Sequence, residues 1–380
     1  MKLTKSVARM ACSLSAVMLS AAAASAQCDG LVGHWRLDGD ALDSSGLGNH
    51  GIPFGSPVYV PGVAGQAMAL DGLDDFVQIA NHPSLNPTNA ISLCAWYRPV
   101  SFSGSGSDPI IDKGYFGHSP PYYQYQLNVT GDRYGTSPGT LGVYCAIGNG
   151  AAGASTGGGF WTAGQWHGVV ATYDGAFLKF FANGVLMQSN PATGPLTDFG
   201  RPVLLGRFNN LGFHLPGTID EVRIFGRALS DDEAVLVSSS PTADPLVLPR
   251  AVRACGGATV TLRAVHLAAA GSTYQWRKDG QVLENETGQS LMLATVTVLQ
   301  TGSYDCLVTG PCGAGVAAAN TVVICAADFN CDGSLDPDDL ADYIGAFFAD
   351  TPLATSDFNA DGLIDPDDLA DFIGAFFAGC

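Results

Sequence analysis

The stretch "GTIDEVRIFG", residues 217–226, decides the fold of the first half of the chain. Apolar and polar residues alternate along it between two glycines, which is the pattern of a β-strand with one buried face. Further runs of this kind are "ISLCAWYRPV" (91–100), "YYQYQLNV" (122–129), "TLGVYCAI" (140–147), "WHGVVATYD" (166–174), "FLKFFANG" (177–184) and "RPVLLG" (201–206). Many short strands without intervening helical patterns predict an antiparallel sandwich.

Two local signals refine this prediction. Asn183-Gly184 accepts the positive φ angles of a type I′ turn, so "ANGV" predicts a tight hairpin. The stretch "ALSDDEAVLV" (228–237) is the one short helix expected in this half, with Ser230 as N-cap and Glu233 three residues later. We therefore expect a nearly all-β first domain.

The first 26 residues have the features of a secretory signal peptide. Lys2, Lys5 and Arg9 precede a short apolar run, and "ASA" at 24–26 fits the cleavage rule, so we expect the mature chain to begin at Gln27. No later stretch has 18 continuous apolar residues, so no membrane insertion is expected. The sequence predicts an extracellular protein, secreted or attached at the cell surface.

The charge balance excludes some partners. The formal net charge is −18, and loss of the three basic leader residues makes it −21. Nucleic acid and anionic membrane surfaces are poor partners for such a chain.

The first domain resembles a known family. "LVGHWRLDGDALDSSGLGNHG", "GQAMALDGLDDFVQI", "ISLCAWYRP", "QWHGVVATYDG" and "GTIDEVRIFGRALSDDE" are, in order, similar to the landmarks of laminin-G-like (concanavalin A-like) jelly-roll domains. The resemblance implies a jelly roll over residues 27–237 that binds carbohydrate or an extracellular partner. It also allows a structural Ca²⁺ held by Asp43 and Asp220 with loop carbonyls.

A polar, proline-bearing stretch at 238–249 predicts a linker to a second domain at 250–325. Trp276 lies thirty residues before Cys306, and Tyr304 lies two residues before that cysteine. This spacing resembles an immunoglobulin-like sandwich with its tyrosine corner. The sequence departs from that family near 263–264, where the partner cysteine of strand B is missing.

Nine cysteines follow the leader, and an exported chain allows disulfides between them. Cys255, Cys306, Cys312 and Cys325 allow three pairings, among which the sequence does not choose. We expect Cys331 to pair with Cys380 and so close the C-terminal segment. The full set of disulfide candidates is Cys94, Cys145, Cys255, Cys306, Cys312, Cys325, Cys331 and Cys380.

Residues 326–380 contain 13 Asp and no Glu, Lys or Arg, and they consist of a repeat. "DFNCDGSLDPDDLADYIGAFFA" (328–349) returns 29 residues later as "DFNADGLIDPDDLADFIGAFFA" (357–378), with 18 of 22 positions identical. Oxygen ligands fall at positions 1, 3, 5, 7, 9 and 12 of a twelve-residue loop with Gly at position 6, the spacing of a calcium loop. The predicted ligands are Asp328, Asn330, Asp332, Ser334, Asp336 and Asp339, and then Asp357, Asn359, Asp361, Leu363 (backbone carbonyl), Asp365 and Asp368.

Each loop is followed by one predicted helix that begins at Pro337 or Pro366, and no helix precedes the first loop. A duplicated loop–helix (F-hand) unit with Asp rather than Glu at position 12 resembles a dockerin, and the "GC" ending resembles planctomycete-type tails. The resemblance implies two bound Ca²⁺ and docking to a cohesin-like or other extracellular scaffold protein. Positions 10 and 11 are Pro-Asp in both loops, unlike the Ser/Thr-type pair of cellulosomal dockerins.

Evidence for an enzyme is weak. The chain has four glutamates, Glu221, Glu233, Glu284 and Glu286, without the alternating carboxylates of a jelly-roll hydrolase. No histidine pair has metal-ligand spacing, and no Gly-x-Ser-x-Gly elbow is present. We expect a non-catalytic protein. The alternative is an extracellular polysaccharide-active enzyme, similar to a glycoside hydrolase, with an unrecognised jelly-roll site.

The most suitable candidates for a rim that binds polysaccharide or glycoprotein are aromatic residues in the irregular stretches 113–125 and 148–161. They are Tyr115, Phe116, Tyr122, Tyr123 and Trp161. The predicted fold class is therefore mainly β: a jelly roll, an immunoglobulin-like sandwich, and a small α-helical calcium module at 326–380.

Overall fold

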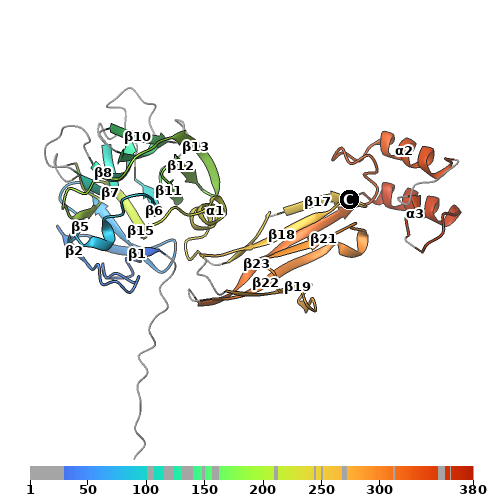
Figure 1. Cartoon of the computed structure of the whole chain (residues 1–380), viewed down its shortest axis with the longest axis horizontal. Coiled ribbons are helices and arrows are strands. Elements are labelled where there is room, and N and C mark those ends of the chain that lie inside the picture. Colours follow the sequence, from blue (N-terminus) through green and yellow to red (C-terminus); the bar gives the residue numbers. More distant parts are fainter. Residues whose placement is uncertain are drawn as a thin grey trace, which may run out of the picture.

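The computed structural model describes three parts, which follow one another in chain order along the long axis of the molecule (Figure 1). The described residues are 30–100, 107–114, 123–130, 140–147, 150–155, 162–208, 213–243, 245–249, 251–267, 272–310, 313–349, 356–359 and 361–379. The first two parts consist mainly of β-strands and the third of two helices, as the sequence predicts.

The first part is a sandwich of two antiparallel sheets. An eight-stranded sheet has the order β13-β12-β11-β6-β15-β4-β3, with β1 beside β15, and a seven-stranded sheet has the order β10-β9-β8-β7-β14-β5-β2. The strands are β1 (Leu31–Trp35), β2 (Gly51–Phe54), β3 (Val58–Pro61), β4 (Gln66–Asp71), β5 (Phe76–Ile79), β6 (Ile91–Pro99), β7 (Ser107–Gly114), β8 (Tyr123–Thr130), β9 (Thr140–Ile147), β10 (Gly150–Ser155), β11 (His167–Tyr173), β12 (Phe177–Ala182), β13 (Val185–Pro191), β14 (Val203–Leu205) and β15 (Pro216–Phe225). The 3₁₀ turn η1 covers Pro83–Leu85.

The apolar positions of these alternating strands form one core between the two sheets, and it includes Trp35, Leu93, Tyr125 and Ile219. Each of the seven predicted strand segments is confirmed. The predicted hairpin joins β12 to β13, where Asn183 and Gly184 have φ angles of 48° and 81°.

The predicted helix is α1 (Asp231–Ser239). The Ser230 side chain accepts the Glu233 N–H, and the Glu233 side chain accepts the Ser230 N–H, which completes a capping box. A second, smaller core beneath α1 includes Cys94, Phe181 and Val237. This core attaches α1 to the outer side of the eight-stranded sheet.

The second part is also a two-layer β structure. Its eight-stranded sheet has the order β20-β19-β22-β23-β16-β18-β21, with β17 beside β23. The elements are β16 (Leu246–Leu248), β17 (Ala251–Cys255), β18 (Val260–Val265), β19 (Thr273–Lys278), β20 (Gln281–Val282), β21 (Ser290–Leu293), the 3₁₀ turn η3 (Val298–Gln300), β22 (Gly302–Gly310) and β23 (Gly313–Cys325). Leu262 and Leu291 from one layer share a core with Trp276 and Cys306 from the other. The sheet is therefore folded onto itself along the long strand β23.

The predicted linker at 238–249 overlaps structured elements. Its first residues belong to the end of α1, and Leu246–Leu248 form β16, which pairs with β18 and β23. The strand was not predicted because three residues are too short a run for alternation to be recognised. The join between the first two parts is thus shorter than the composition indicates.

The third part contains α2 (Pro337–Phe347) and α3 (Pro366–Ala378), each beginning at the predicted proline. Asp336 and Asp365 are their N-caps. Tyr343 and Phe372 are fully buried between the helices and form a core with Ala327. Phe348 and Phe377 at the helix ends are 70% and 78% exposed. The two copies of the repeat therefore pack together around one fully buried aromatic residue per helix.

None of the helices in the part of the chain that the structure describes is both long and apolar enough to span a membrane.

Candidate functional site

Glu221 is the strand glutamate that the hydrolase alternative would require, and it lies at an irregularity in β15. The register with β6 shifts between Asp220 and Arg223. Glu221 has a φ of 48°, a left-handed conformation that costs on the order of 1–2 kcal/mol for a residue with a side chain. Such strain persists only where surrounding contacts fix it. In this protein the fixing contacts are the hydrogen bonds of the Glu221 carboxylate with His34 and Arg223.

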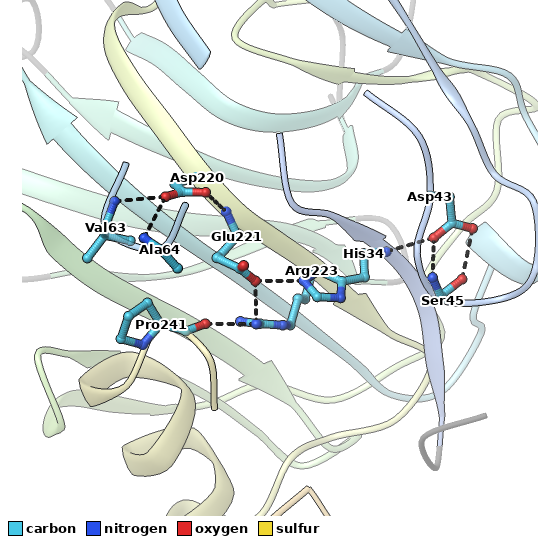
Figure 2. A network of polar contacts seen from close by, with 9 residues as sticks. All are labelled: His34, Asp43, Ser45, Val63, Ala64, Asp220, Glu221, Arg223 and Pro241. Carbon is cyan, nitrogen blue, oxygen red and sulfur yellow. Dashed lines mark hydrogen bonds and ion pairs between the residues drawn. The ribbon is translucent and has the colours of Figure 1, made fainter. Parts of the chain in front are cut away.

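The Glu221 carboxylate accepts two hydrogen bonds through Oε2. His34 Nε2 lies 2.7 Å away and Arg223 Nη2 lies 2.5 Å away (Figure 2). Arg223 Nη2 also donates to the carbonyl of Pro241, just beyond α1, at 2.8 Å. All three side chains are buried. The Glu221 network therefore joins β1 and β15 to the segment that leads into the second part.

The charges of this network are fixed by burial and by mutual contact. Burial alone would raise the pKa of Glu221, but the hydrogen bond from His34 and the charge of Arg223 outweigh it, and the pKa lies below its ordinary value. Burial lowers the pKa of His34, so its imidazole is neutral at pH 7 and donates to the carboxylate. Glu221 is thus an ionised, buried ion-pair partner rather than an accessible acid or nucleophile.

Asp220 points away from this network. Its Oδ2 accepts the N–H groups of Val63 and Ala64 at 2.9 and 3.2 Å, and its Oδ1 accepts the Glu221 N–H at 2.8 Å (Figure 2). The side chain is fully buried. Burial raises the pKa of Asp220 to about 7, although the backbone donors act to lower it.

Asp43 belongs to a different set of contacts. Its carboxylate accepts the N–H groups of His34, Ser45 and Asn49 and the Ser45 hydroxyl, at 2.8–2.9 Å. Figure 2 places Asp43 and Asp220 on opposite sides of the Glu221 network. The structure therefore does not bring together the two residues that were expected to hold a structural Ca²⁺ in the first domain.

One acidic group was missed in the sequence. The carboxylates of Asp71, Asp74 and Asp75 lie within 4.8 Å of one another, at the turn from β4 to β5. Asp75 accepts the N–H groups of Ser56 and Asp71, and Asp71 accepts those of Leu73 and Asp74. These hydrogen bonds stabilise the turn between β4 and β5, which explains why the three carboxylates lie together. The run "DGLDD" (71–75), with three Asp within five residues, is the sequence feature that could have indicated this cluster.

The predicted aromatic rim falls outside the side chains that the structure describes. Tyr115, Phe116, Tyr122 and Trp161 lie outside the described residues, and for Tyr123 only the backbone, in β8, is described.

The first predicted calcium loop folds around its own side-chain oxygens. Asp328 Oδ2 accepts the N–H of Gly333, Asn330 Oδ1 accepts that of Asp332, and Asp332 Oδ1 accepts that of Ser334, at 2.8–3.1 Å. Gly333 has a φ of 87°, which its lack of a Cβ permits. The side-chain oxygens at positions 1, 3 and 5 thus all accept backbone N–H groups of residues 332–334 of the same loop.

The end of this loop is closed by position 12. Asp339 is fully buried, and its two oxygens accept the N–H groups of Asn330 and Asp336 at 3.2 and 3.0 Å. Asp336, at position 9, caps α2. The loop and the first turn of the helix are therefore one hydrogen-bonded unit.

The second loop repeats each of these contacts. Asp357 accepts Gly362 N–H, Asn359 accepts Asp361 N–H, and Asp361 accepts Leu363 N–H. The buried Asp368 accepts the N–H groups of Asn359 and Asp365 at 3.1 and 2.9 Å. Burial acts to raise the pKa of Asp368, but the backbone donors outweigh it and hold the pKa below its ordinary value. This carboxylate is therefore ionised at neutral pH.

The donor set of the loops fits a calcium ion. Carboxylate, amide and carbonyl oxygens are the ligands that Ca²⁺ takes, and both loops offer them. Residues 326–380 contain no Lys or Arg that could pair with these carboxylates in place of the ion. Asp328 Oδ1 is buried without a hydrogen-bond partner. A buried carboxylate oxygen without a donor is costly, and a bound cation would satisfy it.

The cysteines depart from the predicted pairing. Cys331 is disulfide-bonded to Cys255, 76 residues earlier, and not to Cys380. A ring of this size contributes roughly 4 kcal/mol by the chain-entropy estimate. Cys325 is also disulfide-bonded. The side chains of Cys145, Cys312 and Cys380 lie outside the described residues.

Two further disulfide candidates were wrong, because Cys94 and Cys306 are free, buried thiols. Burial raises their pKa values to about 12 and about 11, so both remain protonated and unreactive at neutral pH. They act as small apolar residues of their cores.

The two antiparallel sheets of the first part have the layered arrangement expected of a jelly roll. Residues 71–235 match the family described as the concanavalin A-like lectin/glucanases superfamily, so this region is similar to a laminin G/concanavalin A-like domain. The matched range begins at the end of β4 and ends within α1. No curated protein sequence matches the chain.

Several solved structures are similar to the chain. Domain 4 of AbnA, a GH43 extracellular arabinanase from Geobacillus stearothermophilus, in complex with arabinotriose, is 20% identical; the match covers 55% of this chain and 98% of that one, with a TM-score of 0.44. The binding domain of botulinum neurotoxin DC, in complex with rat synaptotagmin II, is 11% identical over 75% and 72% of the two chains, with a TM-score of 0.45. A Trypanosoma rangeli sialidase in complex with sialic acid is 14% identical over 56% and 33%, with a TM-score of 0.42.

Proposed function

We propose that this protein is a secreted, non-catalytic modular binding protein. Its jelly roll binds carbohydrate or another extracellular partner. Its dockerin-like tail binds two Ca²⁺ and docks the protein to a scaffold or cell surface. The observation that carries the proposal is the pair of loops with five equivalent hydrogen bonds each, one of which also contains the unpartnered Asp328 Oδ1.

In the tail, the chain supplies all the groups that a calcium loop needs. Asp328, Asn330 and Asp332 would bind through side-chain oxygens, Ser334 through its carbonyl and Asp339 through its carboxylate, with the equivalent residues in the second loop. Ca²⁺ would supply positive charge to a segment that has 13 Asp and no basic residue. Position 12, already bonded to the loop and the helix start, would transmit binding to α2 and α3.

The docking role rests on the apolar side chains that the tail leaves exposed. Phe348 and Phe377 are equivalent in the two copies of the repeat, and both are mostly exposed. Ile344 and Ile373, one helical turn before these residues, are also exposed, so each copy presents a pair of apolar side chains rather than a single one. Contiguous exposed apolar side chains are typical of an interaction surface. Such a surface suits a cohesin-like or other scaffold protein.

The middle part is proposed as an immunoglobulin-like spacer. Trp276 is fully buried in the core, and the Tyr304 hydroxyl donates to the carbonyl of Gln300 at 2.8 Å, as in a tyrosine corner. Cys306 is a free thiol, so Trp276 packs here without an inter-sheet disulfide to that cysteine. Apolar packing in place of the bridge agrees with the missing strand B cysteine.

The contacts of Glu221 favour binding over hydrolysis. A catalytic carboxylate must reach the scissile bond, whereas Glu221 is 4% exposed and engaged by His34 and Arg223. The raised pKa of Asp220 is a feature of general acids, and it favours the enzyme alternative. Because Asp220 is fully buried, no substrate oxygen can reach it in this conformation.

A glycan array combined with a hydrolysis screen separates the two functions. Glycan bound without product supports the binding proposal. Release of reducing sugar would establish the hydrolase alternative instead, and its loss in a Glu221→Gln variant that is shown to be folded would assign it to that carboxylate. For the tail, capture of a secreted protein that requires Ca²⁺ and is lost in a Phe348→Ala/Phe377→Ala variant supports docking, whereas capture that is indifferent to both refutes it.

A further inference from the structure

The first calcium loop is covalently attached to the β-sandwich, and the second is not. Cys331 occupies position 4 of the first loop and forms the disulfide with Cys255 of β17. In the second loop, position 4 is Ala360, which has no thiol. Two loops with the same ligands therefore differ in how they are anchored.

The attachment encloses the first half of the loop. β17 pairs in parallel with the end of β23, and Cys255 is in register with Cys325, where the chain leaves the sandwich. The disulfide returns the chain to Cys255 six residues later, with Cα atoms 5.6 Å apart. Residues 326–330 are thus held between a strand pairing at one end and a disulfide at the other.

This short enclosed segment carries the first two predicted ligands, Asp328 and Asn330. Its residue Ala327 is buried in the core of the helical part. Asp328 is 7% exposed and has the unpartnered Oδ1, whereas in the second loop both oxygens of Asp357 accept backbone N–H groups. Cys331 itself has a φ of 61°, a left-handed value that is uncommon for a residue with a side chain.

We propose that the Cys255–Cys331 disulfide preorganises the first calcium loop, so that the two sites are unequal and the first is sensitive to redox conditions. This inference rests on the proposed calcium binding of the tail. The disulfide holds Asp328 and Asn330 in place before the ion binds, so the first loop loses less conformational entropy on binding than the second loop does. The first loop then links the β-sandwich covalently to the tail, whereas the second loop belongs to the tail alone.

The redox step is a simple exchange. A dithiol reductant gives two electrons and two protons to the Cys255–Cys331 bond, which becomes two thiols, while the reductant closes to a cyclic disulfide. By linkage, the factor by which the disulfide raises calcium affinity equals the factor by which calcium resists this reduction.

Calcium titration calorimetry on the chain without its leader tests the proposal, with the wild type compared with a Cys255→Ser/Cys331→Ser variant. We expect two sites in the wild type, and in the variant a weakening of one of them by about tenfold, the scale of a lost preorganising constraint. An Asp328→Ala change should abolish the affected site, and the matched Asp357→Ala change should abolish the other. Two constants that are unchanged in the variant would overturn the inference.

A second measurement uses the wild-type chain alone, in case the variant does not fold. The fraction of Cys255–Cys331 reduced is measured by mass spectrometry of alkylated peptides in dithiothreitol redox buffers, with and without Ca²⁺. Calcium should shift this equilibrium toward the disulfide by the same factor of about ten. No shift, together with two sites by calorimetry, would overturn the inference while the proposed function stands. Absence of calcium binding to the oxidised chain would instead refute the proposed function.

Discussion

Tyr343 and Phe372 stack face to face, with ring centroids 3.9 Å apart and planes inclined by 2°. They are the same position in the two copies of the C-terminal repeat, 29 residues apart. Within its own helix each ring has only a more distant aromatic neighbour, Phe347 at 6.1 Å from Tyr343 and Phe376 at 6.4 Å from Phe372. The close stack between the two helices therefore explains why the loop–helix unit is duplicated. Phe329 and Phe358, from the starts of the two loops, contact the pair edge-on.

The stack predicts a strong dependence of the tail on either ring. Phe372→Ala should destabilise residues 326–379 by about 3–5 kcal/mol, because it opens a cavity in a very small core. Tyr343→Phe removes only the hydrogen bond from its hydroxyl to the Ser356 carbonyl and should cost about 1 kcal/mol. Hydrogen exchange of the tail amides measures both. Equal protection in the two variants would contradict this account of the core.

The Glu221 network predicts a structural role for that carboxylate. Glu221→Gln leaves Arg223 buried without a compensating charge, and we expect a loss of about 3–5 kcal/mol in the unfolding free energy of the jelly roll. Asp231→Asn removes the exposed ion pair with Lys179 and should cost less than about 1 kcal/mol. Urea unfolding measures both. A Glu221→Gln protein as stable as the Asp231→Asn control would contradict the prediction.

Asp220 predicts a pH dependence of stability. Its pKa is raised from 3.8 to about 7 in the folded state, so the folded chain binds this proton more tightly than the unfolded chain. Its contribution is fully present below about pH 4 and is lost as the pH rises to 7. Asp220→Asn should therefore gain stability relative to the wild type between pH 4 and pH 7.

Urea unfolding of both proteins across this range measures the effect. The lowered pKa values of His34 and Glu221 act in the opposite direction, since their contributions are lost as the pH falls. Both residues are present in wild type and variant, so the difference between the two proteins reports on Asp220 together with its charge interaction with Glu221. A difference that does not change with pH would contradict the assignment.

Much of this fold follows from local sequence signals. Alternation predicted β15, Asn183-Gly184 predicted the hairpin, and Ser230 with Glu233 predicted the start of α1. These signals are visible because neighbouring residues alone determine them. The jelly-roll prediction for the first domain agrees with the family match over residues 71–235.

Contacts between distant residues could not be predicted in this way. The Cys255–Cys331 bond depends on β17 lying beside the end of β23, and sequence alone does not give disulfide connectivity. Asp43 and Asp220 each accept hydrogen bonds from separate backbone N–H groups, and the spacing of residues in the sequence does not reveal these partners. The exposure of Phe348 also depends on tertiary structure, because α2 ends at Phe347 and the side chain that follows is exposed.

The tail is proposed to be a two-site calcium module, and the stoichiometry of calcium bound to residues 27–380 tests this proposal most directly. We predict two Ca²⁺ per chain by titration calorimetry, one after Asp328→Ala and one after Asp357→Ala, with the exposed Asp342→Ala as a control that keeps both. Chelator should lower the thermal stability of α2 and α3 in the wild type. A chain that binds no Ca²⁺, or whose two loop variants bind as many ions as the Asp342→Ala control, would contradict the account.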